Sequence, residues 1–166
     1  MDRMVLSLLV EDTAGVLSRI AGLFSRRGYN IESLTVGSTE KAGYSRMTIV
    51  TSGEDETLEQ IKKQLTKLED VVDLIELESN VTSVTRELLL LKVEVDSADR
   101  TQLLEIANVF RAKIIDFSDK ALIIEMTGNN AKVDAFLNLL HSFNIKQVAR
   151  TGITGLLRSA FDDFED

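Results

Sequence analysis

The 166-residue sequence contains no cysteine and a single histidine, and these scarcities exclude several kinds of site. Without Cys, neither a disulfide framework nor a thiolate metal site is possible. His141, the one histidine, falls near the end of a predicted helix, where we interpret it as a solvated helix-end residue. The sequence also lacks a G-x-S-x-G elbow and a Gly-rich phosphate loop. We therefore expect no catalytic residue and no metal ligand.

Long apolar runs and a surplus of basic residues are also missing. The longest apolar stretches have the length of strands, well short of the ~20 residues of a membrane helix. The N-terminus lacks the basic and apolar regions of a signal peptide. The net charge of -8 argues against a protein that grips nucleic-acid phosphates. We therefore expect a cytoplasmic protein that binds neither a membrane nor a nucleic acid.

The first half of the chain alternates strand-like and helix-like segments. Strands are predicted at 4–10, 31–39, 44–51 and 71–77. Between the first two strands, apolar residues recur at the spacing of one helical face, and Arg26, Arg27 and Gly28 are typical of a helix end. A second amphipathic helix follows the acidic residues 54–56. The predicted order of elements is βαββαβ.

The same order repeats after a polar, unpatterned stretch. Strands are predicted at 87–95, 113–117, 121–126 and 146–149, with amphipathic helices after the first and the third. The sequence therefore predicts an α+β protein of two tandem ferredoxin-like βαββαβ sandwiches, each with two helices on one sheet face. We place the domains at 1–78 and 85–158, the linker at 79–84, and an acidic tail at 159–166. An RNA-binding sandwich needs aromatic residues along its third strand, where this chain has only Tyr44.

The most informative segment is residues 11–17, which join a predicted strand to a predicted helix. Gly15 stands at the first helical turn, where unpaired backbone N–H groups attract an anion such as a carboxylate and a residue without Cβ lets the ligand approach. Asp12 adds an acceptor for an ammonium group, so the loop suits the backbone of a free α-amino acid. Taken alone, the same residues also fit a plain turn and helix cap.

Several segments resemble a known family. The loop at 11–17 resembles the ligand loop of ACT domains. The closer similarity is carried by GLFSRRGYNIESLTVG at 22–37, SRMTIV at 45–50, RELLLLKV at 86–93, VFRAKIID at 109–116 and VARTGITGL at 148–156. These segments are similar to the small-subunit family of acetohydroxyacid synthase (acetolactate synthase), and the resemblance runs nearly end to end.

The resemblance implies a regulatory subunit without catalytic activity of its own. Members of this family bind and activate a catalytic large subunit, whose cofactors are thiamine diphosphate, Mg²⁺ and FAD, and confer feedback inhibition by valine in branched-chain amino-acid (valine, leucine, isoleucine) biosynthesis. The resemblance also implies a homodimer through the ACT domain, with the effector at the interface. By position, Asp12, Gly15 and Val16 match the effector-binding residues of one chain, and Asn30 and Ile31 match those of its partner. Asp12 replaces the Asn that valine-sensitive bacterial members often carry.

Two other interpretations compete with the regulatory subunit. A free-standing ACT-type sensor that controls another enzyme or a transcription regulator would share the loop at 11–17, but it has no reason to carry the segments of the second half. A small enzyme on the same sandwich would need a catalytic constellation that the sequence does not offer. A partner search that finds a thiamine-diphosphate enzyme discriminates among the three.

Overall fold

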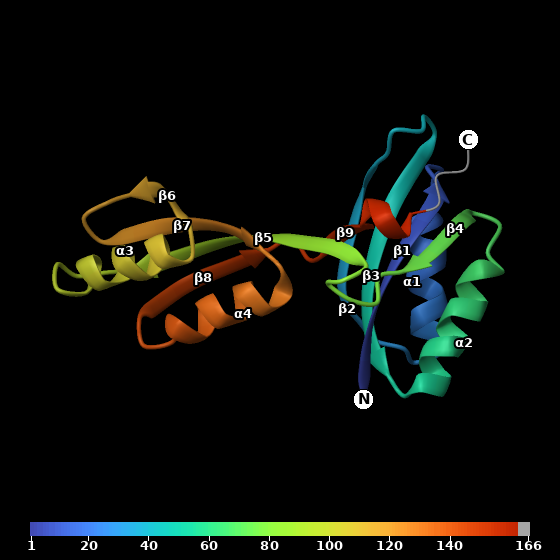
Figure 1. The fold of residues 1–166 in the computed structure, drawn as a ribbon, viewed down its shortest axis with the longest axis horizontal. Coiled ribbons are helices and arrows are strands. Elements are labelled where there is room, and N and C mark those ends of the chain that lie inside the picture. Colours follow the sequence, from blue (N-terminus) through green and yellow to red (C-terminus); the bar gives the residue numbers. More distant parts are fainter. Residues whose placement is uncertain (163–166) are drawn as a thin grey trace. The chain divides into compact units, whose positions relative to one another are not determined.

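The computed structural model describes residues 1–162, which divide into two compact units: residues 1–84 with 153–162, and residues 85–152 (Figure 1). Each unit contains the βαββαβ order that the sequence predicts, so the predicted fold class is confirmed. The last part of the predicted acidic tail, 163–166, lies outside the described residues. The two units are described separately below.

The first unit is a four-stranded antiparallel sheet with the strand order β2-β3-β1-β4. Its elements are β1 (Asp2–Glu11), α1 (Val16–Arg26), β2 (Ile31–Ser38), β3 (Tyr44–Gly53), α2 (Asp55–Thr66) and β4 (Val71–Glu76). Alternate residues of β1 and β3, such as Leu6 and Ile49, form one core with Phe24 of α1 and Ile61 of α2. One face of the sheet is therefore covered by the two helices, as Figure 1 shows.

The opposite face of this sheet, which we call the outer face, is buried at its centre. Val50 has 0% of its surface exposed, and its outer-face neighbours Ser7 and Thr48 are also buried, although none of the three faces the helices. Ile153, far along the chain, contacts this face through hydrogen bonds to the side chains of two β2 residues. The first unit is thus completed by residues that follow the second unit in the sequence.

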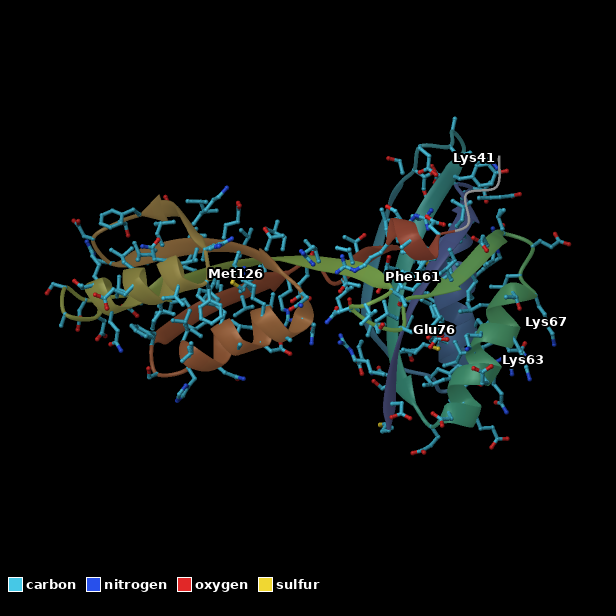
Figure 2. All side chains as sticks on the ribbon, in the orientation of Figure 1. Lys41, Lys63, Lys67, Glu76, Met126 and Phe161 are labelled. Atoms are coloured by element: carbon cyan, nitrogen blue, oxygen red, sulfur yellow. The ribbon has the colours of Figure 1, made fainter. Side chains whose placement is uncertain are left out.

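The second unit repeats the arrangement with the strand order β6-β7-β5-β8. Its elements are β5 (Ser83–Glu94), α3 (Asp99–Val109), β6 (Lys113–Phe117), β7 (Ala121–Gly128), α4 (Asn130–Leu139) and β8 (Asn144–Arg150). Met126, labelled in Figure 2, belongs to a core with Leu91 of β5, Leu103 of α3 and Phe136 of α4. The two units therefore have separate hydrophobic cores.

The division of the structure differs from the predicted domain boundaries at two places. Strand β5 begins at Ser83, inside the stretch expected to be a linker, and β9 (Thr154–Leu157) was not predicted. Residues 153–158, expected in the second domain, belong to the first unit, where β9 pairs with β5 and a 3-10 helix (Ser159–Phe161) follows. Gly152, with φ of 89°, supplies the left-handed backbone at which the chain leaves the second unit. The sequence of β9, TGLL, contains a glycine and two adjacent leucines and therefore shows no polar–apolar alternation.

The burial of Ile153 generates a stability prediction. Ile153→Ala should lower the free energy of unfolding by about 2–5 kcal/mol, because the side chain is only 3% exposed and its removal leaves a cavity. Leu156→Ala is the matched control: Leu156 lies three residues on, in β9, and is 60% exposed. Chemical denaturation measures both. Equal effects of the two substitutions would contradict the burial of Ile153 in the structure.

Candidate effector site

The loop between β1 and α1 is held in place by its backbone. The Glu11 N–H donates to the Asp70 carbonyl and the Asp12 N–H to the Gly43 carbonyl, each at 2.9 Å. Gly15 then takes φ of 88° and ψ of -2°, a left-handed conformation that L side chains rarely adopt, and α1 begins at the next residue. The sequence-based expectation that Gly15 stands at the start of this helix is confirmed.

The first turn of α1 has no side-chain cap. In α4, by contrast, the Asn129 side chain accepts from the Lys132 N–H at 2.9 Å. The first turn of α1 also contains no acidic residue, so no carboxylate of its own neutralises the positive end of the helix dipole. An uncapped helix start beside a glycine is suited to receive a carboxylate from outside.

The other residues of the loop make different contributions. The Val16 side chain is buried in the first core, so only its backbone faces the loop, with its N–H donating to the Thr13 carbonyl at 3.4 Å. The Asp12 side chain is exposed, and its carboxylate makes no hydrogen bond within residues 1–162. The structure thus brings Asp12, Gly15 and the Val16 backbone together at one end of α1.

Asn30 and Ile31 lie at the other end of the same helix. The Asn30 carbonyl accepts from the Thr51 hydroxyl at 2.6 Å, and the side chain of Asn30 is exposed to solvent. Ile31 opens β2 and packs against the edge of the first core. Because α1 has 11 residues, it separates Asn30 from Gly15 by about 16 Å at 1.5 Å per residue. One chain therefore does not bring the two predicted groups together, and a ligand that touches both needs a second chain.

Sequence reasoning missed an ion pair beside the loop. The Arg19 guanidinium donates to both carboxylate oxygens of Asp70, at 2.5 Å from Nε and 3.0 Å from Nη2. This pairing raises the pKa of Arg19 and holds the pKa of Asp70 below its usual range. The remaining nitrogen, Nη1, lies 3.0 Å from where a Cβ on Gly15 would stand. The position of Arg19 one helical turn after Gly15 was visible in the sequence, but Asp70 is 51 residues away.

Three further features of the described residues concern the histidine, metal binding and membrane-spanning helices. His141 is exposed just beyond α4, with Nδ1 at 2.5 Å from the Asn138 carbonyl, as expected for a helix-end residue. Within residues 1–162, no three His, Asp or Glu side chains gather as they would around a metal ion. No helix in that range is long and apolar enough to cross a membrane.

Comparison with known proteins points in one direction. Residues 6–73 match the family model of the AHAS small subunit-like ACT domain, and residues 86–159 match that of the small subunit of acetolactate synthase. The acetolactate synthase small subunit of Mycobacterium bovis is 52% identical over 153 residues, which cover 92% of this chain and 90% of that protein. The chain belongs to the acetolactate synthase small-subunit family.

Membership of the acetolactate synthase small-subunit family extends over both units. A probable acetolactate synthase small subunit from Methanothermobacter thermautotrophicus is 49% identical over 160 residues, covering 96% of this chain and 95% of that protein. The crystal structure of the small subunit from Thermotoga maritima has a TM-score of 0.86 and 42% identity, covering 95% of this chain and 98% of that one. The resemblance inferred from sequence is confirmed.

The conformation of Gly15 predicts that two glycine-to-alanine substitutions, one before α1 and one inside it, change the free energy of unfolding in opposite directions. Gly15→Ala should lower the free energy of unfolding by about 1–2 kcal/mol, because Ala is strained at positive φ and Arg19 Nη1 must move. Gly22→Ala, inside α1 with no positive φ, should raise it by about 0.5–1 kcal/mol. Thermal or chemical unfolding measures both. A neutral or stabilising Gly15→Ala would show that this loop does not hold its left-handed turn.

Proposed function

We propose that this chain is the regulatory subunit of an acetolactate synthase. It binds the catalytic large subunit, raises its activity and makes it sensitive to feedback inhibition by valine in branched-chain amino-acid biosynthesis. The proposal is carried by the identity of 49–52% to acetolactate synthase small subunits over more than nine-tenths of the chain. Thiamine diphosphate, Mg²⁺ and FAD are expected on the catalytic partner, which performs the chemistry.

The loop at the start of α1 supports the effector part of the proposal. A free amino acid carries a carboxylate and an ammonium on one carbon. The uncapped first turn of α1 at Gly15 accommodates the carboxylate, and the exposed Asp12 carboxylate accepts from the ammonium. Arg19, which is paired with Asp70, places its remaining nitrogen Nη1 beside the same turn. These features favour a zwitterion over a simple anion.

The separation of the two residue groups supports a site built from two chains. Asp12 and Gly15 of one chain supply polar contacts, while Asn30 and Ile31 of a second copy supply a polar group and an apolar surface for a branched side chain. The edge strand β2 is available for pairing, since it has a neighbour on one side only and its Val36 is 50% exposed. We therefore expect a homodimer through the first unit.

The second unit supports this function over a free-standing ACT sensor. Residues 86–159 match a model specific to acetolactate synthase small subunits. A sensor that regulates some other enzyme or a transcription regulator has no need of that half. A pull-down with the intact chain tests the choice, since capture of an acetolactate synthase large subunit supports the proposal and capture of an unrelated enzyme contradicts it.

Reconstitution tests the regulatory role directly. The purified chain alone should form no acetolactate from pyruvate, because no cofactor-binding constellation is evident in its sequence. Added to the catalytic subunit, it should raise kcat and make turnover fall as valine is titrated. Steady-state rates with and without the chain measure both effects. Robust turnover of pyruvate by the chain alone would overturn the proposal.

Complementation between two variants tests the shared site. Asp12→Ala and Asn30→Ala should each weaken valine binding by about tenfold to a hundredfold, because each removes a hydrogen bond to a charged group. Asn138→Ala, an exposed substitution in the second unit, should leave binding unchanged.

Mixing the two variant chains should then restore tight binding at about a quarter of the wild-type number of sites. Half of the randomly formed dimers are mixed, and each mixed dimer has one intact site of two. Calorimetric titration of valine gives the number of tight sites. If the mixture binds no better than either variant alone, the site lies within one chain or elsewhere.

A further inference from the structure

Two side chains of β2 form hydrogen bonds with the backbone of one residue far along the chain, Ile153. The Ile153 N–H donates to Ser33 Oγ at 3.2 Å, and the Thr35 hydroxyl donates to the Ile153 carbonyl at 3.0 Å. We call this pair of hydrogen bonds the Ile153 clamp. Ser33 and Thr35 are two residues apart, so their side chains lie on the same face of the strand. The backbone of Ile153 can therefore bond to both.

The clamp lies on the outer face of the first sheet. Ser33 and Thr35 are paired in register with Val50 and Thr48 of β3, both fully or almost fully buried. Ile153 itself is 3% exposed. Because Ile153 is buried and the side chains of Ser33 and Thr35 are half-buried, breaking the clamp removes hydrogen bonds from Ile153 backbone groups that water reaches only in part.

On one side, the clamp is close in sequence to the proposed effector position. Ile31 opens β2 two residues before Ser33, and the pairing register between β2 and β3 shifts between these two residues. Such an irregularity leaves a residue unpaired and bends the strand just before Ser33. A ligand held at Asn30 and Ile31 therefore acts on the segment that carries Ser33.

On the other side, the clamp is one residue away from the second unit. Gly152 is the last residue of that unit and is bonded directly to Ile153. Thr151 is anchored to β5: its N–H donates to the Leu88 carbonyl and its Oγ accepts from the Leu88 N–H, both at 3.1 Å. The position of Ile153 is thus tied to the second unit through two residues.

We propose that the Ile153 clamp couples effector occupancy at the start of β2 to the second unit. Ser33 and Thr35 act as positioning residues that do not touch the effector. The inference rests on the proposed function, since it needs an effector at Asn30 and Ile31 and a catalytic subunit that responds to it. It predicts that, when the clamp is removed, valine still binds to the chain but inhibits the catalytic subunit less.

The test compares the full-length double variant Ser33→Ala/Thr35→Val with Ser38→Ala, an exposed serine on the same strand with no side-chain hydrogen bond within residues 1–162. Valine binding is measured by calorimetry on each folded chain, and valine inhibition on the reconstituted holoenzyme. The double variant should bind valine within about twofold of wild type, while the concentration for half-inhibition rises about fivefold or more, within the range of allosteric couplings. Ser38→Ala should match wild type in both.

The outcomes separate the inference from the proposed function. Absence of valine binding to the wild-type chain overturns both. Wild-type inhibition curves in a double variant that binds valine normally overturn the clamp alone. Parallel loss of binding and inhibition also overturns it, because the clamp would then only support the site. If the double variant fails to fold, Ser33→Ala and Thr35→Val alone give the same comparison, with a smaller separation expected in each. Amide hydrogen exchange at Ile153, which should speed up in Ser33→Ala, checks that the clamp is present in solution.

Discussion

A sheet has two faces, and the first sheet of this protein buries one face and the centre of the other. The helices α1 and α2 cover one face, and their apolar residues form the core with the inward residues of β1 and β3. The outer face carries Val50 at its centre, an aliphatic side chain that helices on the other side do not reach. Ile153, which lies beyond the whole second unit in the sequence, contacts the same face through Ser33 and Thr35 of β2.

The same constraint shapes the proposed control of the catalytic partner. An effector that binds at the end of α1 and the start of β2 touches only the first unit. The returning chain connects this unit covalently to the second: Ile153 is hydrogen-bonded within the first unit, and Thr151, two residues earlier, is hydrogen-bonded within the second. The contacts of Ile153 that stabilise the fold therefore also lie on the route of the proposed coupling. Arg19 and Asp70 fix the geometry of the loop on the opposite end of the helix.

Much of this fold was predictable from the sequence because it depends on local patterns. The helix end predicted at Gly28 and the strands predicted at 31–39 and 44–51 agree with α1, β2 and β3 within a residue or two. Gly15 was identified for the same reason: a glycine between a strand and a helix predicts a special backbone conformation, and φ of 88° confirms it. The matching of Asn30 and Ile31 rested on resemblance, and it remains a prediction.

Contacts between distant residues were not predictable in this way. Nothing in the residues around Arg19 indicates a partner 51 positions later, and nothing around Ser33 indicates one 120 positions later. Strand β9 was not predicted because its sequence, TGLL, shows no polar–apolar alternation and its pairing partner, β5, lies far away in the sequence. Domain boundaries drawn along the sequence also assume that each unit is continuous, whereas the first unit is made of two separate stretches.

The return of the chain also sets an order for biosynthesis. A ribosome releases the N-terminal residues first, and domains commonly fold as they emerge. Here the strands of the first unit appear early, but Ile153, which contacts their outer face, is translated after the whole second unit. The second unit, continuous in sequence, has all of its core residues available before then. The newly made first unit therefore lacks its contact with Ile153 until the second unit has been translated, and the unit that begins second is the first whose sequence is complete.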